Sequence, residues 1–135
     1  MKLTPLSADE VQADWDWLRA GLLHCIQKTA SRYRPEDVYL RLRTDTAWVY
    51  ALDERQGFAV LTKEFDPDGL VLFVWILFAE PNTLSERKGE VYAEFERIAR
   101  ECKAKRIRMQ SPRKGWEREP FFNPTAVVYE HEINP

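Results

Sequence analysis

The chain of 135 residues is 44% hydrophobic and 31% charged, a composition that suits one compact domain over residues 1–135. Its formal net charge of −2 excludes a global attraction to nucleic acid or to an acidic membrane surface, so any electrostatic partner must be recognised locally. The longest apolar run, Leu70 to Ala79, is about half the length that a membrane-spanning helix needs, and no signal-peptide pattern opens the chain. We therefore expect a cytoplasmic protein without a membrane partner.

Cysteine and histidine are too few and too scattered to indicate a metal site. Cys25 and Cys102 fall in helix-like segments without the spacing of a zinc site or of a disulfide framework, and His24 and His131 lie far apart in the sequence. We expect no metal ion, and we expect both thiols to be buried.

The first predicted element is an amphipathic helix over residues 8–30. Ser7 and Glu10 form a capping-box pattern, and apolar residues then recur at steps of three and four. The next stretch, RPEDVYLRLRTDTA, is ambiguous, because its apolar residues alternate as in a strand while its proline and acidic residues suit the first turn of a helix. We predict a short helix there.

Three antiparallel strands are expected next. Residues 48–53 and 57–65 have strand patterns separated by a polar turn, and the turn residues of FDPDGL predict a second hairpin that leads to a strand at 70–79. This third strand is apolar on both faces, as is typical of a strand that helices cover on both sides. We therefore place it in the middle of the sheet, antiparallel to the second strand.

The rest of the chain predicts one more helix and two more strands. Thr83 and Glu86 form a second capping-box pattern, and helical spacing of apolar residues continues to about Lys105. A strand at 106–110 then lies parallel to the third strand through a right-handed crossover. After a turn-rich connector, TAVVYEHEI at residues 125–133 predicts a final strand.

This order of elements resembles the GNAT acyltransferase superfamily over nearly the whole chain. The resemblance implies an α+β fold of three layers, with a mixed, mostly antiparallel sheet and a central pair of splayed parallel strands. The segments AWVYALDE and GFAVLTKEF, with a basic strand ending in PRKGWER, are similar to small GNAT-like proteins of bacteriophage genomes. Those often carry an Arg, a Gly and a Trp after the fifth strand, matched here by Arg113, Gly115 and Trp116.

The resemblance also implies an acyl-CoA site at the start of the helix after the third strand. There the superfamily has Arg or Gln, two residues, Gly, one residue, then Gly or Ala, because backbone N–H groups must approach a pyrophosphate closely. The best match is ERKGEV at residues 86–91, in which only Gly89 agrees. Glu86 brings a carboxylate where a cation or an amide is expected, and Val91 is bulkier than the pattern allows.

Arg87 and Lys88 could compensate through side-chain contacts, so these two residues and Gly89 are the candidate cofactor-binding residues. The alternative is an ordinary capped helix start that binds no cofactor. Because of the mismatches, we expect no tight binding of acetyl-CoA or of another acyl-CoA.

Catalysis in the superfamily generally uses a carboxylate or water to take the proton of an amine, and a Tyr to protonate the leaving thiolate. Glu80, at the end of the third strand, is the candidate base, with a solvated loop carboxylate as the alternative. No Tyr lies between Ser111 and Pro124, so a candidate acid is missing. Tyr92 and Tyr129 are more simply interpreted as packing residues.

A basic strip covers residues 103–118, where seven Lys and Arg residues stand against Glu117 alone. Such a strip could meet DNA phosphate, the 3′-phosphate of a CoA or an acidic protein surface. Cations are also favoured at the end of a helix and on an edge strand, so the strip could equally be an ordinary surface.

Three functions remain open. The leading one is a GNAT-fold protein of phage or prophage type, in the host cytoplasm, that is an acyl-CoA-dependent N-acyltransferase by ancestry, with a small-molecule amine as acceptor and a degenerate site. The alternative is a non-enzymatic phage accessory or virion-assembly protein that uses the fold to bind a protein partner. The weakest is a nucleic-acid-binding module acting through the basic strip, and we expect little affinity for nucleic acid.

Overall fold

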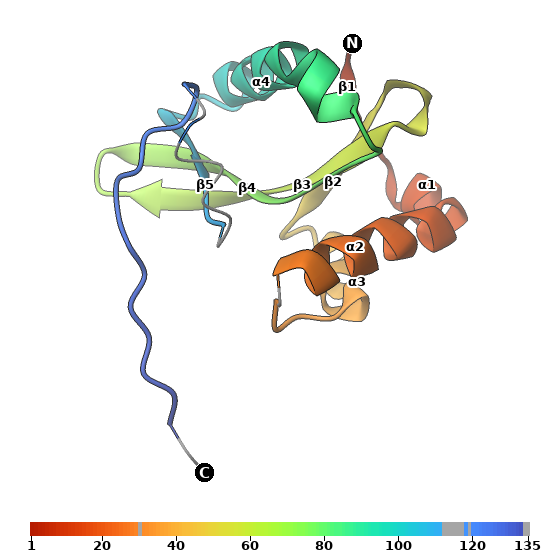
Figure 1. The fold of residues 1–135 in the computed structure, drawn as a ribbon, viewed down its shortest axis with the longest axis horizontal. Coiled ribbons are helices and arrows are strands. Elements are labelled where there is room, and N and C mark those ends of the chain that lie inside the picture. Colours follow the sequence, from red (N-terminus) through yellow and green to blue (C-terminus); the bar gives the residue numbers. More distant parts are fainter. Residues whose placement is uncertain (30, 112–117, 119, 134–135) are drawn as a thin grey trace.

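A computed structural model describes residues 1–29, 31–111, 118 and 120–133. Its elements are β1 (Leu3–Pro5), α1 (Ala8–Ala13), α2 (Trp15–Thr29), α3 (Pro35–Arg43), β2 (Trp48–Leu52), a 3-10 turn (Asp53–Arg55), β3 (Gly57–Asp66), β4 (Gly69–Ala79), α4 (Thr83–Glu101) and β5 (Arg106–Met109). The strands form one sheet in the order β1-β2-β3-β4-β5, with α4 on one face and α1, α2 and α3 on the other (Figure 1). The predicted α+β class with a mixed sheet is confirmed.

Strand pairing follows the predicted directions. β3 runs antiparallel to β4 along its whole length, and β4 runs parallel to β5, with Val71–Val74 beside Arg106–Met109. β4 is the fourth strand of five, however, and β3 is the third, so the expectation that the strand at 70–79 is the middle one was wrong. The order differs because β1, which the sequence analysis did not predict, adds a strand beside β2, and because residues 125–133, which it predicted as a strand, form none.

The helix predicted over residues 8–30 is interrupted at Asp14. The capping box at Ser7 and Glu10 is present, but Asp14 has φ −99° and ψ 13° and ends α1, and α2 begins at Trp15. The break leaves the Asp14 carboxylate 2.6 Å from the guanidinium of Arg55, in the turn between β2 and β3. The short helix predicted after it is confirmed as α3, which has Pro35 in its first turn.

The second capping box does not form. Asn82, with a left-handed φ of 70°, precedes α4, and the Ser85 hydroxyl donates to the Asn82 carbonyl. Thr83 is the first helical residue and is buried, so its side chain does not cap the helix.

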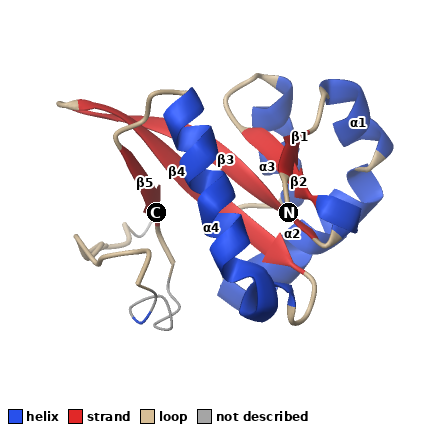
Figure 2. Cartoon of the chain, turned by 90° about the horizontal axis from the view of Figure 1, so that it is seen from above, coloured by secondary structure: helices blue, strands red, loops and turns tan. Residues whose placement is uncertain are grey.

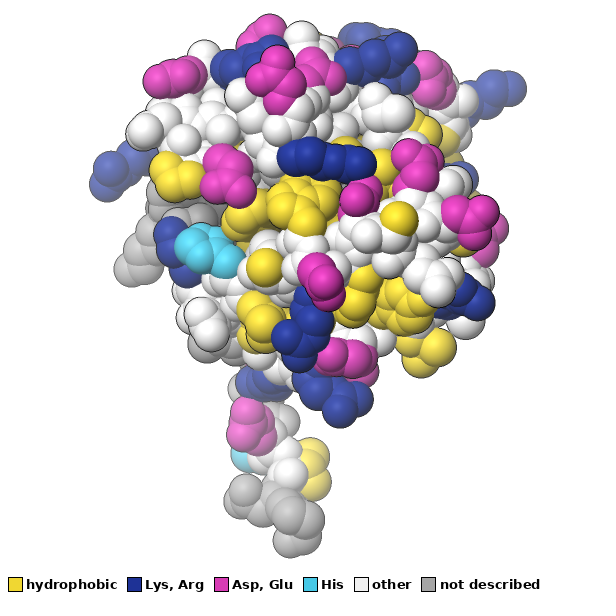
Figure 3. Space-filling model, turned by 90° about the vertical axis from the view of Figure 1, so that its right-hand side faces the viewer, with side chains coloured by type: hydrophobic (Ala, Val, Ile, Leu, Met, Phe, Trp, Pro, Cys, Tyr) yellow, Lys and Arg dark blue, Asp and Glu magenta, His cyan; other side chains and the backbone are white. Residues whose placement is uncertain are grey.

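The final strand predicted at residues 125–133 is absent, because this segment pairs with no strand of the described chain (Figure 1). In Figure 3 the end of the chain projects from the body of the molecule, and acidic and basic side chains are interspersed over the face in view. Arg113, Gly115 and Trp116, which carried the phage-type likeness, lie outside the described residues. No described helix has the length and apolar character needed to cross a membrane.

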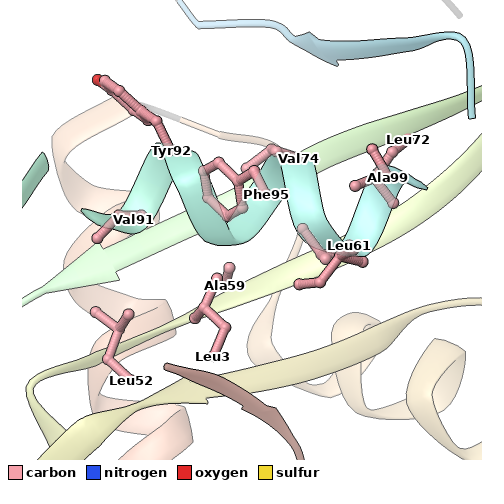
Figure 4. Packing of buried hydrophobic residues seen from close by; sticks show 11 residues of the cluster. Leu3, Leu52, Ala59, Leu61, Leu72, Val74, Val91, Tyr92, Phe95 and Ala99 are labelled. Atoms are coloured by element: carbon pink, nitrogen blue, oxygen red, sulfur yellow. The ribbon is translucent and has the colours of Figure 1, made fainter. Parts of the chain in front are cut away.

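Two hydrophobic clusters cover the two faces of the sheet. On one face α4 lies across the strands and buries Val91 and Phe95 against residues such as Ala59 and Leu61 (Figures 2 and 4). On the other face, residues of α2 and α3 pack around Phe58. Fully burying one large apolar side chain contributes about 1.5–3 kcal/mol, so these clusters hold β4 between two helical layers.

Candidate functional site

A cavity opens where the parallel strands separate. β4 and β5 pair only as far as Val74 and Met109, and beyond this point a cavity of about 1000 Å³ lies between them. Its walls come from the second half of β4, the end of β5, the end of α2 and the C-terminal segment. This volume is at the upper end of the range found for small-molecule sites.

Trp75 lies at the cavity because of a β-bulge in β4. Val60 of β3 pairs with Ile76 and Leu61 pairs with Val74, so Trp75 has no partner in the register of β3. An extra residue of this kind bends a strand and redirects a side chain, and bulges recur next to active sites. The Trp75 ring lies 5.3 Å from the Tyr33 ring, centroid to centroid, and both residues line the cavity.

The end of α2 supplies groups that the sequence analysis did not assign to a site. His24 packs edge-on against Phe78 at 5.7 Å between ring centroids, and the Cys25 thiol donates to the Leu77 carbonyl at 3.6 Å. Both residues line the cavity together with Tyr33, and burial raises the pKa of the Tyr33 hydroxyl above its ordinary value.

No local pattern could have found these groups. Tyr33 and Trp75 are separated by more than 40 residues and meet only because α2 packs across β4.

The thiols of Cys25 and Cys102 are half-buried, whereas the sequence analysis predicted that they are buried. Among the described residues, no group of three or more His, Cys, Asp and Glu side chains could hold a metal ion.

Glu80, the candidate base, is exposed directly after β4. Its backbone N–H donates to the Gln56 carbonyl at 2.8 Å, and its own carbonyl accepts from the Thr83 N–H at 3.1 Å. Glu80 is absent from the described residues that line the cavity, so the structure does not bring it together with His24 and Tyr33. Its catalytic role stays a prediction.

The candidate cofactor-binding residues lie at a bend in α4. Arg87 has φ −129° and ψ 19°, so the regular helix restarts at Lys88, an exposed residue. The first N–H groups of a helix lack intrahelical acceptors, and a Cβ added to Gly89 would meet no atom within 4 Å. The Val91 side chain is fully buried under α4 and does not obstruct this position. The backbone therefore has room for a phosphate.

The side chains do not fit a pyrophosphate. The Arg87 guanidinium donates to Glu90 at 2.8 Å and to Gln56 at 2.9 Å, and its hydrogen bond lowers the pKa of Glu90. Glu86 adds a second exposed carboxylate in the same stretch of helix. Carboxylates at a helix start neutralise its attraction for anions, so an incoming phosphate would meet negative charge and an occupied arginine.

Two arginines of the basic strip, Arg106 and Arg108, are paired with acidic residues. Arg108 contacts Glu64 at 3.1 Å and Asp66 at 2.7 Å, and Arg106 pairs with Asp66 and Asp68. These carboxylates come from β3 and from the β3–β4 turn. They lie far from residues 103–118 in the sequence, so counting the charges within that strip could not reveal them.

No family model matches the sequence, and no curated protein is similar to it. Solved structures share its fold. A structure described as a probable acetyltransferase is 17% identical, with a TM-score of 0.71 and full coverage of both chains. A ribosomal-protein-alanine N-acetyltransferase from Brucella melitensis biovar Abortus 2308 is 14% identical, with a TM-score of 0.68 and coverage of 98% of this chain and 97% of that one.

An aminoglycoside acetyltransferase from an uncultured soil metagenomic sample, in complex with sisomicin, is 12% identical, with a TM-score of 0.69 and coverage of 98% and 96%. The chain has the fold of the GNAT acetyltransferases, as its order of elements predicted. Identities this low show the fold alone, and the bacteriophage origin stays a prediction.

Proposed function

We propose that this chain derives from acyl-CoA-dependent N-acyltransferases, of the phage or prophage type, and that its cofactor site is degenerate. The fold and the cavity between β4 and β5 support the ancestry. One observation carries the degeneracy: the ion pair of Arg87 with Glu90 at the bend of α4. It engages the cation that a pyrophosphate would need and leaves a carboxylate beside it.

A small-molecule amine is the acceptor that this proposal implies. Transfer to an amine requires one group that takes its proton and another that protonates the leaving group. In the cavity, His24 and Tyr33 are groups that can exchange protons, and Tyr33 carries its proton at neutral pH. Glu80 is not among the described residues that line the cavity, so as a base it would have to act from outside the cavity.

The test is thermal unfolding with about 1 mM CoA or acetyl-CoA, a hundred times the dissociation constant of a ligand that binds at about 10 μM. Binding at that ratio stabilises a fold by about 2.7 kcal/mol and raises its melting temperature by several degrees. We expect a shift of less than about one degree. A shift of several degrees would contradict the degenerate site, and His24→Gln, Tyr33→Phe and Glu80→Gln would then be assayed for acyl transfer.

Exposed apolar side chains favour a second candidate, the non-enzymatic protein-binding scaffold. Val127, Tyr129 and Ile133 are 71%, 89% and 82% exposed, and Phe65 at the β3–β4 turn is 80% exposed. Rows of exposed apolar residues mark interaction surfaces. The test measures binding to phage structural proteins. It compares the parent chain with a variant that carries Val127→Ser, Tyr129→Ser and Ile133→Ser. Equal binding by both would argue against this candidate.

A further inference from the structure

The C-terminal segment, residues 125–133, forms the outer wall of the cavity. Ala126, Val128 and Glu130, at alternate positions, line the cavity together with Val127, although Val127 is mostly exposed (71%), as is Tyr129 (89%). Figure 1 shows the segment passing the sheet on the side of β5 and continuing, extended, away from it. In an extended chain, alternate side chains point to opposite sides. The segment therefore already presents one side to the cavity, as a strand would.

Arg32 ties this segment to the other wall. Its Nη2 atom lies 3.0 Å from Oε2 of Glu130 and 2.9 Å from Oε1 of Glu132. The two carboxylates are two residues apart, so both lie on the side of the segment that faces the domain. All three side chains are more than half exposed, and ion pairs this exposed contribute little stability and weaken with salt. The tether is therefore reversible.

The cavity contains an unpaired strand edge. β5 pairs with Val71–Val74 only, so the edge of β4 at Trp75–Ala79 has no strand on that side among the described residues. Free edges accept an extended peptide as an added strand. The sequence of the C-terminal segment, TAVVYEHEI, has the β-branched and aromatic residues that favour strands.

We propose that the C-terminal segment is an intramolecular ligand of the cavity. It closes onto the edge of β4 at Trp75–Ala79 as an added strand, with Arg32 holding Glu130 and Glu132. The strand that the sequence predicts at residues 125–133 thus forms only in the closed state.

Amide hydrogen exchange of Trp75–Ala79 tests the closure. We compare the full chain with a chain that ends at Asn123 and with Arg32→Glu. Exchange of these amides should be at least about tenfold faster in the shortened chain and in Arg32→Glu than in the full chain, because both lose the added strand that protects the amides. Arg34→Glu is the matched control, since Arg34 is a neighbouring exposed arginine that pairs with Asp37 instead. It should leave exchange unchanged.

Two further experiments test whether the contact of Arg32 with Glu130 and Glu132 is specific. Reversing Glu130 and Glu132 to Arg in the Arg32→Glu chain should restore protection, because the charges are then exchanged. A synthetic peptide of residues 124–133, added to the chain that ends at Asn123, should also restore it, whereas the same peptide with Lys at positions 130 and 132 should not. The charge-reversal pair keeps the test valid should the shortened chain fail to fold.

Unchanged exchange in both the shortened chain and Arg32→Glu would overturn the proposal. Dilution tests whether the added strand comes from a second copy of the chain. If protection disappears on dilution while light scattering shows a dimer becoming a monomer, the strand comes from a second copy, and the intramolecular contact is overturned. The melting shift with CoA separates this proposal from the function. A shift of several degrees with CoA in either chain would contradict the degenerate site and leave the strand contact standing, whereas unchanged exchange overturns the strand contact whatever the result with CoA.

Discussion

The guanidinium of Arg87 donates to the carboxylate of Glu90 across 2.8 Å, at the residue where α4 bends. The same guanidinium reaches the side chain of Gln56, before β3, at 2.9 Å. The chain thus provides internal partners for Arg87, two residues before the open backbone of Gly89. The expected weakness of the cofactor site follows from this arrangement and not from a lack of space.

Removing the carboxylates should strengthen CoA binding. In Glu86→Gln with Glu90→Gln, Arg87 loses its ion pair and the helix start loses two negative charges. Each charge at a helix terminus contributes about 0.3–1 kcal/mol, so removing two should let the double variant bind CoA about threefold to thirtyfold more tightly than the parent. Isothermal titration calorimetry measures the difference. Glu96→Gln, which removes a carboxylate paired with Arg100 further along α4, is the control. Equal affinities in all three chains would contradict this explanation.

Two glycine substitutions should have opposite effects on stability. Gly89→Ala adds a Cβ to open space in a helix, which should raise the free energy of unfolding by about 0.5–1 kcal/mol. Gly57→Ala places a Cβ 2.2 Å from the Phe78 carbonyl oxygen in the neighbouring strand, and such overpacking should lower the free energy of unfolding by about 1–3 kcal/mol. Urea unfolding measures both. Destabilisation by Gly89→Ala would show that the bend in α4 needs a glycine.

The hairpin of β3 and β4 could be predicted because its apolar runs and its turn residues are local features. The short strand β1 could not, because three residues carry no pattern. β1 is held by distant groups: the Leu3 N–H donates to Glu94 at 2.7 Å, and Arg97 donates to the Leu3 carbonyl at 3.1 Å. The cofactor candidates lie on one local stretch and could be assigned from sequence, whereas the cavity wall of Tyr33 and Trp75 depends on tertiary packing.

Stability should fall at acid pH through the carboxylates of Asp66 and Asp68. The hydrogen bond from Arg106 lowers the pKa of Asp68 to about 2, and that from Arg108 lowers the pKa of Asp66. An unfolded Asp titrates near about 3.9, so the stabilisation is present above that pH and is lost as the pH falls toward about 2. Asp66→Asn with Asp68→Asn should therefore have a lower urea midpoint than the parent at about pH 6.

The difference between this variant and the parent should shrink as the pH falls toward about 2, where Asp68 of the parent is becoming protonated, and should disappear only below that pH. Asp16→Asn, an exposed carboxylate in the first turn of α2, is the control for a general loss of negative charge. A difference between parent and double variant that does not change with pH would show that the asparagine amides disturb the turn, and that ionisation is not the cause.

Binding to DNA should be weak or undetectable near about 150 mM salt, because exposed charges are screened beyond roughly 8 Å at that ionic strength. Within the basic strip, Arg106 and Arg108 would have to leave Asp66, Asp68 and Glu64 to reach a phosphate. Ile107 and Met109 pack inward against the cluster under α4 and offer no stacking surface for bases.

Fluorescence anisotropy of labelled duplex and single-stranded DNA across a salt series measures this affinity. Each phosphate that the protein neutralises adds about −0.9 to the slope of log affinity against log salt concentration. If several arginines and lysines contact DNA phosphates, the slope should therefore be steep. Arg106→Glu with Arg108→Glu is the comparison variant. Dissociation constants below about 1 μM at physiological salt, lost in that variant, would show that DNA displaces the carboxylates and that the basic strip is the functional surface.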